Sequence, residues 1–155
     1  MKIPRIYIDT SVIGGCFDSE FAQWSNGLME DFRLGVLKPI LSDLLETELK
    51  NAPTPVQSLY ADLITWQAEF VVTTEKAFNL ANIYQQREIL TPKYYDDGLH
   101  VALATIAEVD IIVSWNFKHI VHFLKINKFN KVNLEFGYQS LQIYSPREVI
   151  QYGKD

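Results

Sequence analysis

The chain has 155 residues, of which 48% are hydrophobic and 21% are charged, so it can bury a sizeable core within one domain spanning residues 1–155. Its formal net charge of −5 argues against a broad electrostatic grip on nucleic acid, but not against a small site whose acids bind metal ions. The single cysteine, Cys16, excludes an internal disulfide and a cysteine-rich zinc site, and favours a reducing, cytoplasmic compartment. We expect no signal peptide and no membrane association, because no apolar run approaches the ~20 residues of a membrane helix.

A short apolar run near the N-terminus, Arg5 to Ile8, predicts a buried central strand, and Asp9 follows it directly. Ligands bind at the carboxyl ends of strands in open α/β sheets, and a bare carboxylate there is costly unless a cation or hydrogen-bond donors satisfy it. Two hydroxyl residues, Thr10 and Ser11, come next. The alternative is that Asp9 merely caps the following turn.

The spacing of apolar residues next predicts a helix over residues 19–34, whose aromatic stripe is expected to belong to the core. Gly27 weakens this helix by about 1 kcal/mol, so two shorter helices are an alternative. A strand over 38–42 and a helix over 43–49 follow. Further on, we expect a helix over 56–68, a strand over 70–73 and a helix from Thr73 or Thr74 to about Ile89, none of which carries visible chemistry.

The helix over 43–49 carries two acids of different character. Its apolar stripe consists of Leu44, Leu45, Leu49 and Ala52. Glu48 falls on that stripe, whereas Glu46 falls about 200° away from it and is expected to be a solvated surface charge. An acid on an inward face needs a reason, so Glu48 is a candidate site residue. The alternative for Glu48 is a snorkelling or salt-bridged side chain.

A helix over residues 94–107 is apolar on most sides and is therefore expected to be buried. Asp96 and Asp97 stand at its head, where they could complement the helix dipole or present a carboxylate to a metal ion. Helical spacing alone does not choose between these two acids. His100 lies one turn after Asp97 on the same side, and we expect it to be a hydrogen-bonded core residue.

A buried strand over 111–114 ends in Ser114 and is followed by Asn116, a polar group placed as Asp9 is placed after its own strand. Lys118 and His119 could contact an anion, and a surface lysine and histidine are the alternative. Residues 121–136 form the most basic part of the chain. A last strand over 142–144 leads to Ser145, Pro146 and Glu148, which predict the start of a final helix that ends near Tyr152.

Strands alternate with helices throughout, which predicts an α/β fold with a mostly parallel central sheet and helices on both faces. In such a fold Asp9, Glu48, Asp97 and Asn116 can meet above the carboxyl ends of the strands. Carboxylate and amide oxygens without sulfur suit Mg²⁺ or Mn²⁺ rather than zinc. Such a site can activate water and clamp a phosphate, and neither a Gly-rich phosphate loop nor a serine nucleophile elbow competes with it.

Taken together, the motifs resemble those of PIN-domain proteins, the family that includes the VapC toxins of bacterial toxin–antitoxin pairs. The resemblance covers nearly the whole chain, and the tail from Ser114 through Ser145-Pro146 resembles a subgroup of stand-alone PIN proteins. It is carried by four segments: Tyr7-Ile8-Asp9-Thr10-Ser11-Val12, Leu41-Ser42 with Glu48-Leu49, Asp97-Gly98-Leu99-His100-Val101-Ala102-Leu103-Ala104, and Val113-Ser114-Trp115-Asn116.

The resemblance implies a three-layer α/β/α sandwich and a metal-dependent ribonuclease. It implies that Asp9, Glu48 and Asp97 form the acidic metal site, with Asp97 rather than its neighbour Asp96, and that Thr10, Ser11 and Ser114 support the site or contact a phosphate. Asn116 stands where the family usually has another aspartate. This departure removes a negative charge and weakens binding of a second ion, so one-metal catalysis, slow catalysis and loss of activity all stay open.

Three functions are therefore weighed. The first is a Mg²⁺- or Mn²⁺-dependent endoribonuclease, the toxin of a toxin–antitoxin pair. Its substrate would be single-stranded or structured RNA, its partner a cognate antitoxin, and its expected state a homodimer. The second is a PIN-like module that binds RNA or protein without cutting. The third is a phosphatase with Asp9 as nucleophile, which is disfavoured because Ser11 stands where such enzymes usually carry a second acid.

Overall fold

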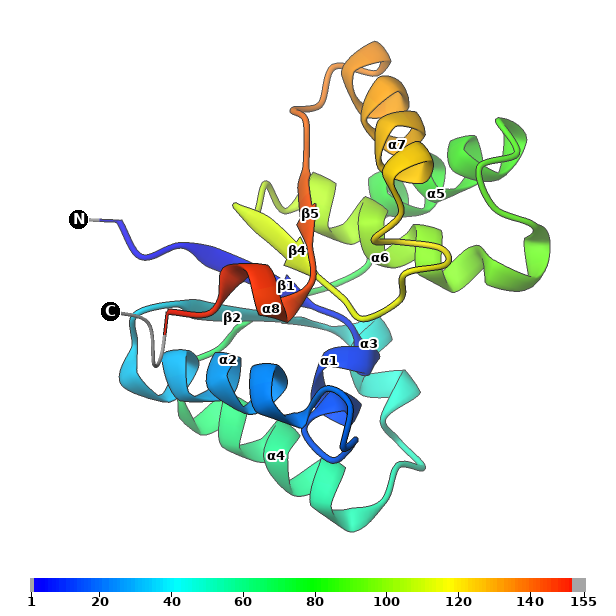
Figure 1. Ribbon diagram of the computed structural model, residues 1–155. Coiled ribbons are helices and arrows are strands. Elements are labelled where there is room, and N and C mark those ends of the chain that lie inside the picture. The colour runs from blue at the N-terminus through cyan, green and yellow to red at the C-terminus, as the bar shows by residue number, and fades with distance from the viewer. Residues whose placement is uncertain (1, 152–155) are drawn as a thin grey trace.

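The computed structural model describes residues 2–151 and contains one five-stranded sheet in the order β3-β2-β1-β4-β5 (Figure 1). All four strand pairings are parallel, so the expectation of a mostly parallel sheet is confirmed. The carboxyl ends of the strands therefore share one edge of the sheet. The strands are β1 Arg5–Ile8, β2 Lys38–Ser42, β3 Glu69–Val71, β4 Ile111–Val113 and β5 Gln142–Tyr144.

Helices cover both faces of the sheet, which gives the expected three-layer α/β/α sandwich. Figure 1 shows α1, α2 and α4 below the sheet and α5, α6 and α7 above it. Within residues 2–151, no helix has the length and apolar character needed to cross a membrane. The helices are α1 Thr10–Gly15, α2 Ala22–Leu34, α3 Asp43–Glu48, α4 Thr54–Thr65, α5 Glu75–Gln86, the 3₁₀ turn Pro92–Tyr94, α6 Tyr95–Ile106, α7 Phe123–Glu135 and α8 Pro146–Val149.

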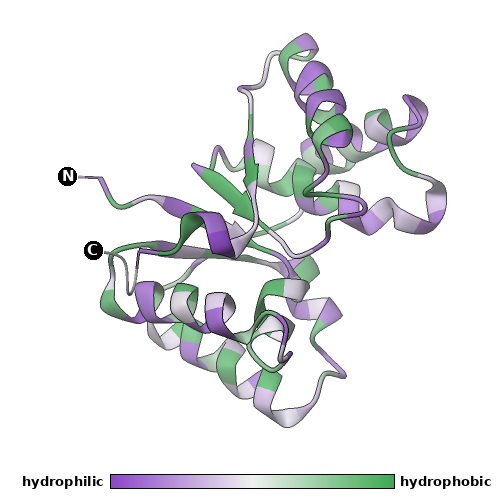
Figure 2. Cartoon of the chain, viewed as in Figure 1, coloured by the Kyte–Doolittle hydropathy of each residue, from purple (hydrophilic) through white to green (hydrophobic). Residues whose placement is uncertain are grey.

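Two hydrophobic cores lie on opposite faces of the sheet because successive strand residues point in opposite directions. In β1, Ile6 and Ile8 pack into the core beneath the sheet, whereas Tyr7 packs into the core beside α5 and α6. Since both faces are covered, the central strands β1, β2 and β4 are apolar over most of their length, whereas the edge strands β3 and β5 carry Glu69 and Gln142. Figure 2 shows this for β4, while α2 and α7 mix hydrophilic and hydrophobic residues as surface helices do.

The first third of the chain differs from the sequence expectation. Residues 10–15 form α1, which was not expected, and α2 begins at Ala22 rather than near residue 19. The alternative of two shorter helices split at Gly27 is wrong, because α2 runs unbroken through that position. A Cβ at Gly27 would lie 3.4 Å from the Ile150 side chain, so the small residue lets the chain after α8 pack closely on α2.

Other element ends also shift. The strand expected over 70–73 covers Glu69–Val71, and the helix expected to reach Ile89 ends at Gln86, before Glu88 adopts a positive φ of 57°. The last helix ends at Val149 rather than near Tyr152, which itself lies outside the described residues. It stops early because the backbone N–H of Gln151 donates to Asp31 Oδ2 at 2.6 Å, which fixes the chain against α2.

Candidate functional site

Asp9 lies at the junction of β1 and α1, where the two central strands end. Ile8 pairs with Val113, so the residues that follow β1 and β4 are neighbours in space. The side chain of Asp9 is nearly buried, at 5% exposure. Its Oδ1 accepts a hydrogen bond from Ser11 Oγ and its Oδ2 accepts one from Ser114 Oγ, both at 2.6 Å. Asp9 is the N-cap residue of α1, and its backbone carbonyl accepts from the N–H of Val12 at 3.2 Å, whereas its carboxylate makes no capping bond and binds the two serines instead.

Both serines are themselves held by backbone groups. Ser11 Oγ accepts from the N–H of Trp115 at 2.8 Å, and Ser114 Oγ accepts from the N–H of Asn116 at 2.9 Å. Each hydroxyl therefore donates a hydrogen bond to Asp9 and accepts one from a backbone N–H of the loop after β4. This arrangement ties the end of β1 to the end of β4 and fixes both oxygens of the Asp9 carboxylate.

Gly15 lets α1 approach the loop after β4. The indole Nε1 of Trp115 donates to Ser25 Oγ at 2.8 Å, and the Trp115 ring stacks on Phe21 with centroids 4.2 Å apart. A Cβ at Gly15 would stand 2.6 Å from Trp115 Nε1, a distance that no side chain tolerates. A residue with a side chain at position 15 would therefore displace Trp115 and, with it, the support of Asp9.

Glu48, the last residue of α3, reaches the same edge of the sheet. Its Oε1 accepts from Thr10 Oγ1 at 2.6 Å and lies 2.7 Å from His100 Nε2. The Glu48 side chain remains 28% exposed, whereas the His100 side chain is only 3% exposed. The Glu48 side chain thus turns toward buried His100, and this contact is the salt bridge that was the alternative for Glu48.

His100 connects Glu48 to the core beside α6. Its Nδ1 lies 2.6 Å from the hydroxyl of Tyr7, which in turn lies 2.9 Å from Ser42 Oγ. The expectation of a buried, hydrogen-bonded histidine is confirmed. The sequence did not reveal that the other ring nitrogen contacts Glu48, because the signal is a contact between helices that are 52 residues apart.

Asp97, rather than Asp96, faces this cluster. Asp96 is exposed at the head of α6, whereas Asp97 is half-buried. The side chain of Asn116 lies close enough to Asp97 to lower the pKa of that carboxyl by hydrogen bonding. Asn116 Oδ1 also accepts from the backbone N–H of His119 at 2.9 Å, which fixes the loop after β4.

The acids of the cluster fall into two electrostatic classes. Burial raises the pKa of Asp9, and the charge of Glu48 adds to the shift against the opposing effects of His100, Ser11 and Ser114. Burial likewise raises the pKa of Asp97, with the charges of Asp9 and Glu48 adding to it.

Glu48 behaves differently. Burial alone would raise its pKa, but the hydrogen bond and charge of His100, together with Thr10, outweigh burial and lower it. Burial lowers the pKa of His100, but the hydrogen bond and charge of Glu48 outweigh burial, so the pKa of the imidazole is raised. Glu48 and His100 therefore stabilise each other's charged forms, whereas burial disfavours the charged forms of Asp9 and Asp97.

The donor set fits a hard divalent cation, because carboxylate and amide oxygens are the ligands that Mg²⁺ and Mn²⁺ prefer. Within the described residues, however, no three histidine, cysteine or acidic side chains are placed so that they could hold one ion together. Glu48 is already engaged by Thr10 and His100. Asp9 and Asp97 form no ion pair with a lysine or arginine in the described residues, so they would hold an ion directly, and Glu48, whose charge His100 already stabilises, would join through a water molecule.

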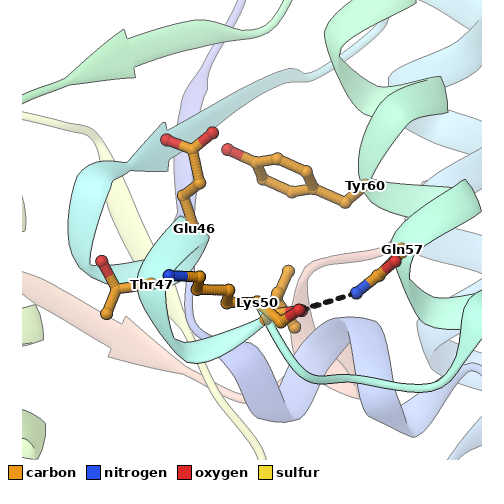
Figure 3. Close-up of a pocket in the computed structure, with 6 residues that line it drawn as sticks. Glu46, Thr47, Lys50, Gln57 and Tyr60 are labelled. Carbon is orange, nitrogen blue, oxygen red and sulfur yellow. Dashed lines mark hydrogen bonds between the residues drawn. The ribbon is translucent and has the colours of Figure 1, made fainter.

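Glu46 lies away from the acids, on a different side of α3. It is exposed, as expected, and helps to line a cavity of about 500 Å³ together with Thr47, Leu49, Lys50, Gln57 and Tyr60 (Figure 3). Figure 3 shows its carboxylate pointing toward the Tyr60 hydroxyl. Burial, and then the charge of Glu46, raise the pKa of Tyr60 to about 12. None of the site acids lines this cavity.

Lys118 and His119, the two residues considered for anion contact, take different positions. Lys118 is exposed, whereas His119 is only 7% exposed. The ring of His119 stacks on Tyr94 with centroids 3.8 Å apart. The alternative of a surface residue is therefore wrong for His119.

Comparison with known proteins adds no relative to this picture: no family model matches the chain, and no curated protein matches it. The function of the site is therefore inferred from its geometry. That geometry consists of a rigidly held Asp9, a half-buried Asp97 beside Asn116, and a Glu48 that is paired with His100.

Proposed function

We propose that the chain is a Mg²⁺- or Mn²⁺-dependent endoribonuclease of the PIN-domain type. The observation that carries the proposal is the pair of acids Asp9 and Asp97, which come from different elements and both have a raised pKa. Neither carboxyl forms an ion pair with a lysine or arginine in the described part of the chain. Two such acids at the carboxyl edge of a parallel sheet are suited to binding a cation that in turn binds a phosphate.

The residues of the chain would share the work in a definite way. A bound divalent cation supplies a water of lowered pKa and neutralises charge on the scissile phosphate. Ser11 and Ser114 hold both oxygens of Asp9, so this carboxylate needs no reorganisation. Glu48, ionised by its pairing with His100, would orient a water, and Thr10 fixes its carboxylate. Attack of water on phosphorus with departure of the 3′-oxygen would leave a 3′-hydroxyl and a 5′-phosphate.

The proposal extends to the biological setting that the sequence resemblance implies. The protein would be the toxin of a toxin–antitoxin pair, act on RNA in the cytoplasm, form a homodimer and be inhibited by a cognate antitoxin. A buried, free thiol at Cys16 is compatible with a reducing compartment. Co-expression with the product of a neighbouring short reading frame tests this extension: relief of growth arrest supports it, and unchanged growth contradicts it.

A second function is favoured by two observations. Asn116 contributes no negative charge, and the chain as a whole carries a net charge of −5. Both would suit a PIN-like module that binds RNA or protein without cutting. The two functions make opposite forecasts for cleavage when a divalent cation is added.

The test is cleavage of a 5′-labelled single-stranded RNA by the purified chain in Mn²⁺, in Mg²⁺ and in EDTA. We expect cleavage only with a divalent cation, and none by Asp9→Asn. Glu46→Gln is the matched control, because it removes an acid of the same helix as Glu48 without touching the site. Cleavage that persists in EDTA or in Asp9→Asn overturns the proposal, and RNA binding without cleavage in every metal supports the second function.

A further inference from the structure

The segment from Asn116 to Lys125, which connects the site to α7, carries lysine and aromatic side chains. Asn116 Oδ1 holds the backbone of His119, whose ring stacks on Tyr94. Tyr94 ends the 3₁₀ turn directly before α6, the helix that carries Asp97. This surface therefore touches the site from both sides, through the loop after β4 and through the head of α6.

Cationic groups gather on this surface. Lys125 Nζ lies 3.2 Å from His119 Nδ1, and Lys93 Nζ lies 5.6 Å from the centre of the Tyr94 ring. The pKa of His119 is lowered by burial and then by the positive charges of Lys125, Lys118 and His122. His119 is thus neutral near pH 7 and can accept a hydrogen bond from the Lys125 ammonium, which fixes that charge in place.

These charges have no acidic partner on the protein. None of Lys93, Lys118 and Lys125 forms an ion pair among residues 2–151. The whole chain has a net charge of −5, so a group of unpaired cations beside an acidic site is a local reversal of the overall charge. Unpaired cations beside the proposed catalytic acids would attract a polyanion such as RNA.

Exposed aromatic rings alternate with these cations along the segment. Phe117, whose ring meets that of Trp115 edge-on with centroids 6.0 Å apart, is 49% exposed, and Phe123 is 75% exposed; each lies within two residues of a lysine of the group along the sequence. Single exposed apolar residues are common on proteins. Rings interleaved with cations are instead the pattern of surfaces that stack unpaired bases while binding the phosphate backbone.

We propose that the surface formed by Lys93, Tyr94, Phe117, Lys118, Phe123 and Lys125 binds a single-stranded RNA segment that flanks the cleaved bond. The lysines contact phosphates and the exposed rings stack on bases. A single strand is favoured over a duplex because the bases of an A-form helix are already stacked and not available to side chains. The inference rests on the proposed ribonuclease function and names the form of its substrate.

The test measures binding of a fluorescein-labelled single-stranded RNA of roughly 12 nucleotides to the full chain by anisotropy in EDTA, where cleavage plays no part. We expect Lys118→Ala/Lys125→Ala to weaken binding by about 10-fold or more and to reduce the slope of log K against log salt by about 1.4, which is the loss of two phosphate contacts. We expect Phe123→Ala to weaken binding by about 5-fold or more.

The chain offers matched controls for both changes. Lys128→Ala removes an exposed lysine of α7 that lines a hollow with Arg87 and Ile89 instead, and Leu124→Ala removes an exposed apolar residue beside Phe123. Each control should leave the Kd within about 2-fold of wild type. Equal losses in controls and test variants, an unchanged Kd in the test variants, or equally tight binding of a duplex of the same length would each overturn the inference.

Failure of the inference can be told apart from failure of the proposed function. Metal-dependent cleavage by the wild type, with RNA binding unaffected in the test variants, overturns the strand-binding surface and leaves the ribonuclease intact. Binding that depends on the surface, without cleavage in any metal, supports the surface and contradicts the ribonuclease. If an acidic protein binds the surface and RNA does not, the inference is wrong.

Discussion

Glu48 and the pair Asp9 and Asp97 occupy one edge of the sheet, yet their charges are balanced in different ways. Glu48 faces the buried imidazole of His100 at 2.7 Å, and its pKa is lowered. Asp9 receives hydrogen bonds from neutral hydroxyls, and Asp97 lies beside a neutral amide; the charge of His100 lowers both pKa values, but burial outweighs it and leaves both raised. The imidazole therefore offsets the cost of burying the charge of Glu48 but not that of Asp9 or Asp97.

Asp97→Asn removes one of the two acids whose pKa is raised, and it should have the largest effect on RNA cleavage. We expect cleavage of RNA to fall by at least about 1,000-fold, as for removal of other essential catalytic groups. The fold should persist, because the amide keeps the shape of the carboxyl. Asp96→Asn, an exposed neighbour in the same turn, is the control and should cleave as wild type does. Full activity in Asp97→Asn would remove Asp97 from the site.

His100→Ala breaks the compensated side of the comparison. This substitution removes the imidazole that pairs with Glu48 and leaves the Tyr7 hydroxyl without one hydrogen-bond partner. The free energy of unfolding should therefore fall by about 3 kcal/mol. Urea denaturation at pH 7 measures the loss. His100→Gln keeps an N–H donor near Glu48 and should recover part of the stability. If the alanine variant is as stable as wild type, the ion pair contributes nothing and the two kinds of acid do not differ.

The stability of the metal-free protein should depend on pH in a direction set by Asp97. Folding raises its pKa above the ordinary 3.8, so the folded state binds the proton more tightly and loses stability as the pH rises from 3.8 through the raised value. Asp97→Asn removes that loss. In EDTA its Tm should therefore exceed that of wild type at pH 7. The gap should close toward pH 4, and a gap that widens there would show that the sign is wrong.

Asn116→Asp sharpens the comparison by adding a third uncompensated acid, and its effect should be the smallest. The new charge repels Asp9 and Asp97 in the absence of metal, so the protein should melt slightly lower in EDTA. The same charge strengthens binding of a divalent cation, so Mn²⁺ should raise the Tm further than in wild type, with cleavage at least as fast. An identical metal response in the two proteins would place Asn116 outside the site.

Much of the fold follows from patterns that are local in sequence. The apolar runs of β1 and β4 and the helical stripes between them predict the parallel sheet, and the wheel of α3 separates Glu48 from Glu46. The helix α1 was missed because it is only six residues long and ends in Gly14 and Gly15, two residues of low helix propensity. Gly15 is a helical residue kept small by the indole of Trp115, a contact across 100 residues of sequence that no local pattern reveals.

The electrostatic side of the site is harder to read from sequence. The choice between Asp96 and Asp97 depends on how α6 sits against the loop after β4, and helical spacing alone left it open. His100 was expected in the core, where it lies, but its role as the partner of Glu48 arises from the packing of α3 against α6. His119 was given a surface alternative because its stacking on Tyr94 joins two segments that are 25 residues apart.

The hydrogen bond from Ser114 to Asp9 joins residues 105 positions apart, and this has a consequence for when the site appears during folding. Contacts of such high sequence separation form late, because a long loop must close before they bring any gain. A chain emerging from the ribosome cannot complete the carboxylate cradle until β4 has been made and has paired with β1. In hydrogen exchange, the amides of Trp115 and Asn116, which donate to the two serines, should open only with the whole sheet. A partly folded chain in which β4 has not yet paired with β1 therefore lacks the hydrogen bonds that hold the Asp9 carboxylate.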